Sequence, residues 1–481
     1  MKELSTLLHG VQVVAREGAA EVQVAELVFD SRRVIAGSCF FAVRGTATDG
    51  HRFIPMALEQ GAVAVVCEEL PAKIDPRVAY VVVEDSEQTM ACMASAFYGD
   101  PSRELKLVGI TGTNGKTTTA TLLYELVRKL GYRAGLISTV VYKIDDREIP
   151  STHTTPDTIR LNKMLREMVD AGCDYCFMEC SSHAIVQRRT YGLHFAGGLF
   201  SNLTHDHLDY HKTFADYLKA KKGFFDALPK SAFALTNGDD RNGAVMVQNC
   251  RAKVKNYSLR SMADYRCKIV EMHLDGMLLQ VDGREMWTSL TGRFNASNLL
   301  VVYAAAVELG FEKEEVLTAL SLLQPVSGRF ECIRSRGGVI GVVDYAHTPD
   351  ALENVLQTID EIRSEQSSLI VVCGCGGNRD REKRPEMARI ASAHATTTIL
   401  TSDNPRHEDP EAILDEMEQG LPQGARYLRI TDRAAAIRTA VMLAKEGDVV
   451  LVAGKGHENY QIIGDEKHPF DDREALRKAF E

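Results

Sequence analysis

A glycine-rich loop between an apolar strand and an amphipathic helix constrains the fold of this chain most. Residues 109–119 read GITGTNGKTTT and overlap a short apolar run at 107–111. The segment after the loop repeats apolar residues at helical spacing, which predicts one buried helix face. That face comprises Leu122, Leu123, Leu126, Val127 and Leu130. A strand, a glycine loop and a helix in this order are typical of a phosphate-binding loop in an α/β sheet.

The chemistry of the loop predicts binding of ATP or another nucleoside triphosphate. Glycines let backbone N–H groups turn toward phosphates, and the helix N-terminus adds partial positive charge. Lys116 would reach the β- and γ-phosphates, and the Thr117 hydroxyl would ligate Mg²⁺. Ile110 stands where the strict G-x-x-x-x-G-K-[ST] pattern has its first glycine. A glycine-rich turn with an incidental lysine is therefore the alternative interpretation.

The remaining apolar segments indicate an α/β fold with three domains. A chain of 481 residues is too long for one ordinary core. Near-continuous apolar strands alternate with helical segments, which indicates largely parallel sheets covered on both faces. We expect a small N-terminal α/β domain at 1–100, a central phosphate-loop ATPase-like doubly wound domain at 101–328, and a C-terminal Rossmann-like domain at 329–481.

Local patterns add detail to two of these domains. Alternation around a D-G turn within residues 255–290 predicts an antiparallel hairpin. A helix is expected from about residue 298 to 308, ending at Gly310. Five strands are expected in the third domain, within VIGVVDYA, SLIVVCGC, TTTILTSDN, YLRITD and DVVLVAGKG.

Composition narrows the class of partner. The formal net charge of -10 argues against nucleic acid or an anionic membrane as the main partner. No run approaches the ~20 apolar residues that span a bilayer, and the first residues do not read as a signal peptide. We expect a cytoplasmic monomer that acts on small molecules, with no nucleic-acid or membrane partner.

Eleven cysteines are scattered along the chain, which fits a reducing compartment. Cys173 and Cys176 form a C-x-x-C with Cys180 close behind, so a redox or zinc role has to be weighed. No second C-x-x-C follows at zinc-site spacing. We therefore expect these thiols, and also Cys373 and Cys375, to behave as small buried apolar side chains.

Polar residues after two further strands suggest a metal site. Glu179 ends an apolar strand, and ligands gather at the carboxyl ends of parallel strands, so Glu179 is a candidate Mg²⁺ ligand or else a buried structural carboxylate. The segment NLTHDHLDYH carries His205, His207 and His211, which read alone suggest zinc and a metallohydrolase. Beside a phosphate loop, one histidine that assists Mg²⁺ is more economical. Lys221 lies in a basic helical stretch where a solvated side chain is the default.

Together these motifs resemble the Mur ligase family, across all three domains. The family's T-G-T-N-G-K-T matches residues 111–117, and its E-x-S-S-H matches 179–183. The further matches are N-L-x-x-D-H-L-D-x-H at 202–211, G-x-x-N-x-x-N at 292–298, S-G-R-F at 327–330 and D-Y-A-H-x-P-D at 344–350.

The resemblance implies roles for individual residues. The implied ATP-binding residues are Gly112, Thr113, Asn114, Gly115, Lys116, Thr117, Thr118, Asn295, Asn298, Arg329, Asp344 and His347. The implied metal ligands are Thr117, Glu179, His207 and Lys221, the last as a carbamate, because a lysine ammonium cannot ligate a cation whereas its CO₂ adduct offers carboxylate-like oxygens. Lys116, Lys221 and His207 are the implied catalytic residues.

The first domain matches the branch of the family that builds the muramoyl tripeptide, through D-S-R-x-V-x-x-G at residues 30–37. That match implies that the first domain binds the UDP end of the sugar nucleotide. The implied contacts to the UDP-muramoyl peptide are Ser31, Thr154, Thr155, Ser181, Gln187 and Arg189.

The segment SDNPRHED carries the motif D-N-P-R, which in the resembling family marks enzymes that add meso-diaminopimelate. This amino acid has a carboxylate where lysine has none, and a guanidinium binds a carboxylate with two parallel hydrogen bonds. Without the resemblance, Arg406 could equally be a surface charge. The implied amino-acid contacts are Arg379, Asp403, Asn404, Pro405, Arg406, Gly454 and Glu458. Asn378 replaces an aspartate common in the family.

The resemblance thus implies an ADP-forming ligase of cell-wall precursor synthesis that uses Mg²⁺ and ATP and works through an acyl phosphate. It would add meso-diaminopimelate to UDP-N-acetylmuramoyl-L-alanyl-D-glutamate. The same ligase adding L-lysine and a folylpolyglutamate synthetase-like ligase are the alternatives. A phosphate-loop switch ATPase and a zinc metallohydrolase are more distant rivals.

Overall fold

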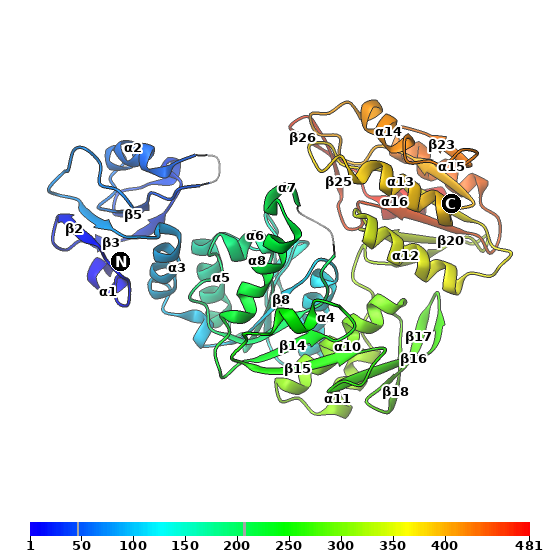
Figure 1. The fold of residues 1–481 in the computed structure, drawn as a ribbon, viewed down its shortest axis with the longest axis horizontal. Coiled ribbons are helices and arrows are strands. Elements are labelled where there is room, and N and C mark those ends of the chain that lie inside the picture. Colours follow the sequence, from blue (N-terminus) through cyan, green and yellow to red (C-terminus); the bar gives the residue numbers. More distant parts are fainter. Residues whose placement is uncertain (46–47, 205–207) are drawn as a thin grey trace.

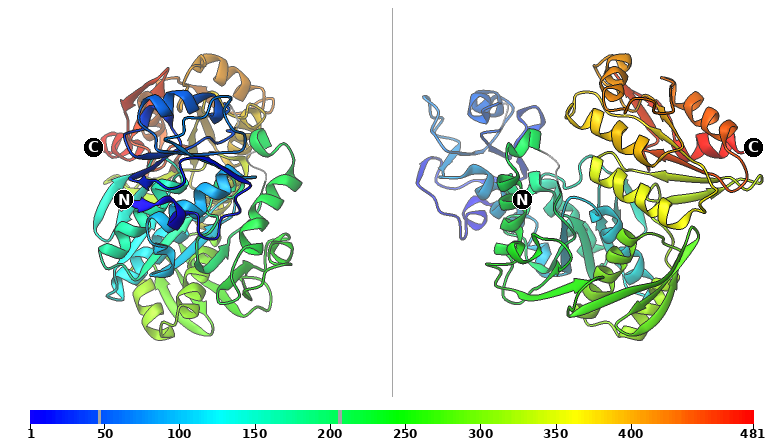
Figure 2. Two further views of the ribbon diagram at one scale, coloured as in Figure 1. Left: turned by 90° about the vertical axis from the view of Figure 1, so that its left-hand side faces the viewer. Right: turned by 45° about the vertical axis from the view of Figure 1, so that its right-hand side comes forward.

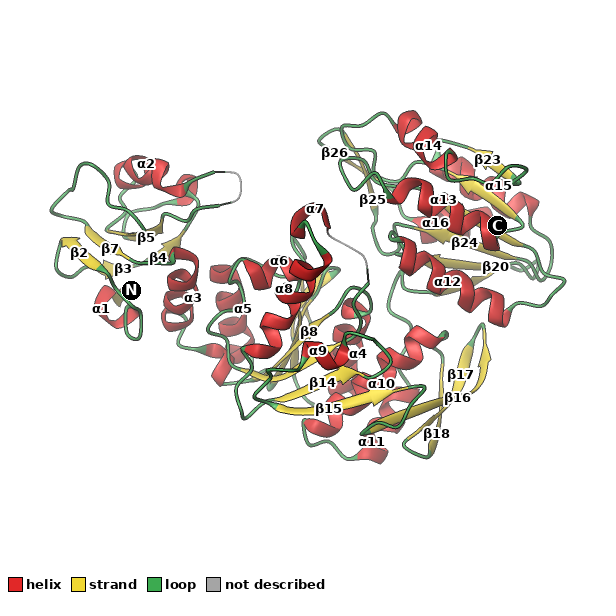
Figure 3. Cartoon of the chain, viewed as in Figure 1, coloured by secondary structure: helices red, strands yellow, loops and turns green. Residues whose placement is uncertain are grey.

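The computed structural model describes residues 1–45, 48–204 and 208–481. The expected α/β class is confirmed, with strands in three main sheets and helices against them (Figures 1 and 3). An N-terminal and a C-terminal unit lie at opposite ends of the molecule, each beside a central unit (Figure 2). In the described residues, no helix is both long and apolar enough to cross a membrane.

The N-terminal unit is a small sheet with helices on both faces. β2 pairs antiparallel at one edge, and the other strands are parallel. The order is β2 (Ala15–Gly18), β7 (Ala79–Val82), β6 (Ala64–Cys67), β5 (Ser38–Phe41) and β4 (Glu26–Val28). A short pair joins β1 (Lys2–Glu3) to β3 (Gln23–Val24). The helices are α1 (Leu4–Leu7), α2 (Ile54–Glu59) and α3 (Ser86–Phe97), with 3-10 turns η1 (Ser31–Arg33), η2 (Gly50–Phe53) and η3 (Pro101–Arg103).

The central unit is built on one long mixed sheet. Its strand order is β11 (Arg147–Pro150), β10 (Val141–Ile144), β9 (Ala134–Ile137), β12 (Tyr175–Glu179), β8 (Lys106–Thr111), β13 (Phe195–Phe200), β14 (Phe233–Asn237), β15 (Lys253–Ser258), β16 (Tyr265–His273), β17 (Gly276–Val281) and β18 (Arg284–Thr288). The strands from β9 to β16 pair parallel, as the near-continuous apolar runs predict.

Helices bury both faces of the central sheet. They are α4 (Lys116–Lys129), α5 (Thr158–Asp170), α6 (Ser182–Val186), α7 (Leu208–His211), α8 (Phe214–Asp226), α9 (Gly243–Met246), α10 (Arg293–Glu308) and α11 (Lys313–Ser321). Successive β8 residues point to opposite faces, as strand geometry requires. Val108 joins the core made with α4 and α10, whereas Leu107 joins the core made with α5 and α8.

The expected antiparallel hairpin within residues 255–290 is confirmed. β16 and β17 turn at Leu274–Asp275, and β17 turns into β18 at the D-G pair Asp282–Gly283. The expected start of the following helix at residue 298 is wrong: α10 begins at Arg293. Gly292, with φ +101°, turns the chain into this helix, and the polar side chains of Asn295 and Asn298 inside its first turns hid its beginning.

The C-terminal unit contains all five expected strands in a second doubly wound sheet. The order is β19 (Glu331–Arg334), β20 (Ile340–Asp344), β24 (Val449–Ala453), β21 (Leu369–Cys373), β22 (Thr397–Leu400) and β23 (Tyr427–Arg429). The helices are α12 (Pro349–Ile362), α13 (Lys383–His394), α14 (Pro410–Glu418), α15 (Arg433–Leu443) and α16 (Asp472–Ala479). The hairpin of β25 (Tyr460–Ile463) and β26 (Glu466–Pro469), which the sequence patterns did not indicate, follows β24.

Candidate active site

The glycine-rich loop joins β8 to α4, as expected. Gly112 has φ +151°, and a Cβ atom there would lie 2.0 Å from Ser201 Oγ. Gly115 has φ +83°, and a Cβ atom there would lie 2.6 Å from Asn298 Oδ1. A side chain at either position would collide with the neighbouring segment, so the loop needs glycine at both. Ile110 is a buried residue of β8, which explains why the loop lacks the first glycine of the strict pattern.

Two of the predicted metal ligands touch each other at the head of α4. Thr117 Oγ1 donates a 2.8 Å hydrogen bond to Glu179 Oε1, and the Thr139 N–H donates to the same oxygen at 2.7 Å. Glu179 ends β12 and is only 1% exposed. A carboxylate and a hydroxyl at the carboxyl edge of a parallel sheet are oxygen donors of the kind that Mg²⁺ prefers, so these residues fit the ion.

Both predicted catalytic lysines that the structure describes lie against the loop backbone. Lys116 Nζ donates to the carbonyl oxygens of Gly112 and Thr113 at 2.9 and 2.7 Å. Lys221 Nζ, from α8, donates to the Gly112 carbonyl at 2.6 Å. Lys221 is only 1% exposed, so the solvated side chain that is the default for a basic helix is wrong here. Its terminal nitrogen lies 4.7 Å from the centre of the Tyr217 ring.

The predicted ligand His207 lies outside the described residues, together with His205. His211 is buried, and its Nε2 lies 2.8 Å from Ser182 Oγ. Within the part of the chain that the structure describes, no three His, Cys, Asp or Glu side chains gather as a metal site.

The cysteines of the C-x-x-C segment are buried, as expected. Cys176 and Cys180 are free thiols, and burial raises the pKa of both.

The C-terminal unit reaches the phosphate loop at two points. Asp350 Oδ2, in the first turn of α12, accepts hydrogen bonds from Asn114 Nδ2 at 2.7 Å and from Thr204 Oγ1 at 3.2 Å. Arg329 Nη2 lies 3.4 Å from Thr117 Oγ1. These contacts bring residues more than 200 positions apart to one nucleotide loop.

The other predicted nucleotide residues lie around this junction. Asn295 Nδ2 donates to the Thr291 carbonyl at 2.8 Å, and Asn298 faces Gly115. Asp344 ends β20 and accepts from the Phe330 N–H at 2.7 Å. Burial raises the pKa of the Asp344 carboxyl, and the nearby Arg329 cation opposes that rise. His347 is exposed just beyond β20, with Nδ1 2.9 Å from the Tyr345 carbonyl.

The residues predicted for the muramoyl peptide gather beyond β12, except for Ser31. Thr155 Oγ1 donates to the Glu179 carbonyl at 2.7 Å, and the Ser181 N–H donates to Thr155 Oγ1 at 3.2 Å. Arg189 Nη1 donates to the Thr155 carbonyl at 2.7 Å, and Arg189 Nε donates to Gln187 Oε1 at 3.0 Å. The same chain segment carries Thr154, whose Oγ1 accepts from Thr139 at 3.0 Å. Ser31 begins η1 in the separate N-terminal unit.

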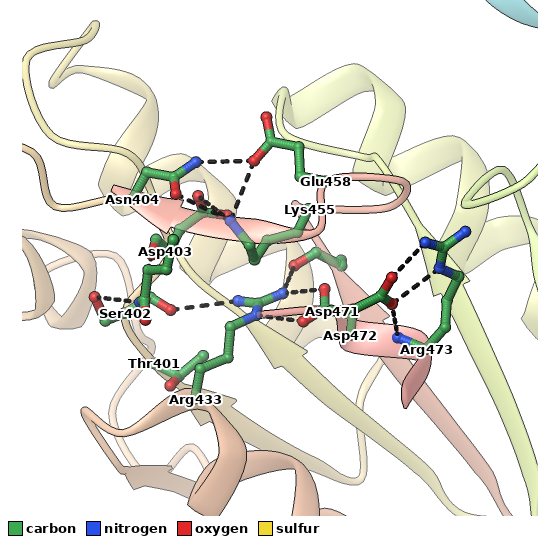
Figure 4. A network of polar contacts seen from close by, with 12 residues as sticks. Thr401, Ser402, Asp403, Asn404, Arg433, Lys455, Glu458, Asp471, Asp472 and Arg473 are labelled. Atoms are coloured by element: carbon green, nitrogen blue, oxygen red, sulfur yellow. Dashed lines mark hydrogen bonds and ion pairs between the residues drawn. The ribbon is translucent and has the colours of Figure 1, made fainter. Parts of the chain in front are cut away.

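The residues predicted for the amino-acid pocket follow three strands of the C-terminal sheet: Arg379 follows β21, 403–406 follow β22, and Gly454 and Glu458 follow β24. Figure 4 shows Asp403, Asn404 and Glu458 of this set. Asn404 Nδ2 donates to Glu458 Oε2 at 2.9 Å. Gly454 has φ +119°, and a Cβ atom there would lie 2.7 Å from Asp403 Oδ2. A fully buried ion pair lies next to these loops. Arg433 donates two 2.7 Å hydrogen bonds to Asp472 and a third, at 3.0 Å, to the Ala453 carbonyl at the end of β24.

Arg406 lies across the same pocket. Its Nη1 donates to the Gly377 carbonyl at 2.9 Å, and its backbone has φ +52°. Burial lowers the pKa of the Arg406 guanidinium, and the nearby Arg379 cation lowers it further, whereas Asp403 and Glu458 oppose both. The structure thus brings Arg379, Asp403, Asn404, Arg406 and Glu458 to one place. Pro405 lies between Asn404 and Arg406 in the chain.

Sequence reasoning missed two polar residues of the site. Lys455 is fully buried beside Asn404 and Glu458, and Asp350 bonds to the phosphate loop. Asp350 is the last residue of the D-Y-A-H-x-P-D motif, and Lys455 lies between the predicted contacts Gly454 and Glu458. The only available signal was an ionisable residue next to glycines or a proline at a strand end, and that signal does not distinguish buried from solvated side chains.

A cleft of about 1130 Å³ separates the central unit from the C-terminal unit. Its lining includes Thr139, Ser151, Gln324, His457, Glu458 and Arg473. Thr139 bonds to the predicted metal ligand Glu179, and Glu458 is a predicted amino-acid contact. The cleft therefore connects the predicted phosphate site with the predicted amino-acid site.

Comparison with known families agrees with this architecture. The model of the Mur ligase middle domain matches residues 110–306, that of the Mur ligase glutamate ligase domain matches 328–456, and that of the Mur ligase family catalytic domain matches 23–98. The chain belongs to the Mur ligase family.

Individual relatives make the match more specific. A protein of Parabacteroides distasonis named UDP-N-acetylmuramoyl-L-alanyl-D-glutamate–2,6-diaminopimelate ligase is 55% identical over 480 residues, covering 99% of each chain. A solved structure of a ligase of that name is 34% identical, with a TM-score of 0.68, and covers 95% of this chain and 94% of that one. The MurF ligase of Thermotoga maritima in complex with ADP shares the fold at 19% identity, with a TM-score of 0.63 and coverage of 95% and 96%.

Proposed function

We propose that this chain is the ATP-dependent ligase that adds meso-diaminopimelate to UDP-N-acetylmuramoyl-L-alanyl-D-glutamate in peptidoglycan precursor synthesis. The observation that carries the proposal is a phosphate loop on one sheet and an Arg406 pocket on another, with a cleft between the two units that Thr139 and Glu458 both line. The full-length identity to relatives of that name supports the same reaction. The alternatives of an L-lysine-adding enzyme and a folylpolyglutamate synthetase-like ligase lack this support.

The reaction divides into two steps with separate geometry. A carboxylate oxygen of the D-glutamate residue attacks the γ-phosphorus, the bond to the β-phosphate oxygen breaks, and ADP leaves. Lys116 offsets the charge that develops on the phosphoryl oxygens. Mg²⁺, when bound by Thr117 and Glu179, together with His207 and carbamylated Lys221, would supply further positive charge there.

In the second step, the neutral amine of diaminopimelate attacks the acyl carbon. A C–N bond forms, the C–O bond to phosphate breaks, and the amine loses a proton. The C-terminal unit carries the amino acid, so its docking on the central unit brings the amine to the acyl phosphate and excludes water.

Charge complementarity supports diaminopimelate over lysine. The pocket holds the formal cations Arg379, Arg406 and Lys455 and the formal anions Asp403 and Glu458, which leaves one net positive charge. Diaminopimelate with one neutral amine has two carboxylates and one ammonium, and so one net negative charge. Lysine in the corresponding state is neutral and leaves the guanidinium of Arg406 without a carboxylate partner.

The remaining assignments are part of the same proposal. Residues 1–100 bind the UDP-sugar, with Ser31 at its UDP end, residues 101–328 bind ATP, and residues 329–481 bind the amino acid. The free cysteines of the described residues favour a reducing compartment, so we place the enzyme in the cytoplasm. We propose a monomer whose partners are its small-molecule substrates.

The test is ADP release by the purified protein with Mg-ATP and UDP-N-acetylmuramoyl-L-alanyl-D-glutamate, with meso-diaminopimelate and L-lysine assayed in parallel. Turnover with diaminopimelate, and on the order of 10⁴-fold less with lysine, is expected. Equal turnover with lysine would remove the specificity and keep the ligase. Release of AMP and pyrophosphate, or ATP hydrolysis without any acceptor, would reject the proposed reaction.

A further inference from the structure

Lys455 is a fully buried lysine that none of the residue roles above explains. It lies two residues beyond the end of β24, and its relative exposure is 0%. Its Nζ donates to Asn404 Oδ1 at 3.0 Å and to Glu458 Oε2 at 3.1 Å, and it lies 4.0 Å from Asp403 Oδ1 (Figure 4). The acceptors therefore come from two different loops, after β22 and after β24.

Burying an ammonium group is costly unless acceptors surround it. The C-terminal fold has its own polar support at this end of the sheet, because the Arg433–Asp472 pair ties α15 to α16 and to the Ala453 carbonyl. Lys455 bonds instead to side chains that line the amino-acid pocket. The buried lysine therefore supports the polar side chains of the pocket and not the packing of the sheet.

The contacts divide the Glu458 carboxylate into two halves. Oε2 accepts from both Asn404 and Lys455. Figure 4 shows the other oxygen pointing away from both partners. A carboxylate held by one oxygen presents the second oxygen in a defined direction, which is what recognition of an ammonium group requires.

We propose that Lys455 is a positioning residue of the amino-acid site, an inference that rests on the proposed function. Its ammonium group fixes Asn404 and Glu458 relative to each other and reduces the repulsion between the Glu458 and Asp403 carboxylates. Glu458 can then receive the ammonium group of the incoming amino acid. Lys455 does not touch the phosphate loop, so it acts on amino-acid binding and not on formation of the acyl phosphate.

The experiment compares the wild type with Lys455→Met, which keeps the length of the side chain and removes its charge. Loss of a charged hydrogen-bond partner raises the KM for diaminopimelate about 10- to 100-fold. The KM values for ATP and for the UDP-muramoyl dipeptide stay within about twofold of wild type. Oxygen-isotope scrambling in ATP with the dipeptide alone, which reports reversible acyl-phosphate formation, also stays unchanged. Lys445→Met, at an exposed position near the opposite end of β24, is the matched control.

Each outcome decides the proposal. A double variant with Glu458→Gln should be little worse than Glu458→Gln alone, because Lys455 acts through that carboxylate. An unchanged KM for diaminopimelate, or a parallel rise in all three KM values, overturns the positioning role. Lys455→Gln repeats the test if Lys455→Met loses isotope scrambling, and loss of scrambling in both assigns Lys455 to folding. If the wild type scrambles isotope but ignores diaminopimelate, the proposed amino acid is wrong, which is a separate result.

Discussion

Arg406 holds a backbone conformation that arginine seldom adopts. Its φ of +52° lies in the left-handed region, which costs a residue with a Cβ about 1–2 kcal/mol. The conformation places the guanidinium over the pocket, against the Gly377 carbonyl and next to Arg379. Strain of this kind persists where the surrounding structure holds it and the position is used.

We expect Arg406→Gln to lower kcat/KM for meso-diaminopimelate about 100-fold, because a bidentate charged pair is lost. The kcat/KM for L-lysine should stay within a few-fold, so the discrimination between the two amino acids falls. Parallel ADP-release assays measure both. Arg426→Gln, at an exposed arginine of the same unit, is the control and should leave the ratio unchanged. Retained discrimination in Arg406→Gln would contradict the role of the guanidinium.

His457 predicts a pH effect on stability. Burial lowers its pKa to about 3, helped by the cations of Arg329 and Arg473, by His347 and by Lys455, and within the described residues its Nδ1 is a buried atom without a hydrogen-bond partner. The unfolded state binds a proton at this histidine below about pH 6.5, whereas the folded state binds it only near pH 3, so acid favours unfolding. Protonation of this group therefore costs no stability above about pH 6.5, and it lowers the free energy of unfolding by ~1.4 kcal/mol per pH unit between about 6.5 and 3.

We therefore expect His457→Gln to show a shallower acid-side fall of the thermal midpoint than wild type. Thermal unfolding at a series of pH values from 8 to 4 measures the slope, in steps of about one unit. His468→Gln, in the exposed hairpin strand β26, should retain the wild-type slope. Identical slopes in wild type and His457→Gln would show that the imidazole is not kept neutral by the fold.

The positions of several candidate site residues were predictable from motifs, because a phosphate loop is a local feature of the chain. Gly112, Lys116 and Thr117 follow from one strand–loop–helix segment. Lys455 and Lys221 were harder, because a sequence does not report which lysines of a basic or glycine-rich stretch become buried. Lys221 was assigned only through the family resemblance, and His207 remains a prediction because it lies outside the described residues.

At the scale of elements, the parallel strands were predictable because burial on both faces leaves uninterrupted apolar runs. Hairpins at the edges of the sheets were less predictable from the sequence. The turn between β10 and β11 uses Asp145, with φ +50°, followed by Asp146, without the glycine that usually marks such a turn. The turn between β17 and β18 is the pair Asp282–Gly283, and it carries that glycine.

The buried Arg433–Asp472 pair gives an element-scale prediction. Arg433→Met leaves Asp472 buried without its partner and should destabilise the C-terminal unit by about 3–5 kcal/mol. Arg433→Met combined with Asp472→Leu removes both charges and should recover most of that loss. Urea unfolding measures both variants, with Arg438→Met at an exposed position of the same helix as control. A double variant as unstable as the single one would assign the loss to packing.

At the scale of the whole molecule, three α/β units were predictable from the rhythm of strands and helices, but their arrangement was not. No spacing rule indicates that Asp350 meets Asn114, 236 residues earlier in the chain. The predicted domain boundaries at residues 100 and 328 likewise remain predictions, since a break in pattern marks a linker only approximately.

Asp350 links docking of the C-terminal unit to the nucleotide loop. Asp350→Ala removes the acceptor that holds Asn114 and Thr204, so we expect the KM for ATP to rise about 10-fold, as for loss of a charged hydrogen bond. Proteolysis within the linker at residues 322–328 should become faster, because the two units separate more often. Gln357→Ala, exposed on the same helix, is the control. Unchanged ATP kinetics with unchanged proteolysis would exclude a docking role.

The phosphate loop and the Arg406 pocket stand on separate sheets, each with its own core. In the proposed function, the residues that activate the growing peptide and the residues that select the next amino acid therefore belong to different sheets. We expect that grafting the loops after β21, β22 and β24 from a relative that prefers another amino acid changes which amino acid is added. Formation of the acyl phosphate from ATP should stay the same. The identity of the third residue of the peptide could therefore change without any change in the ATP-dependent step.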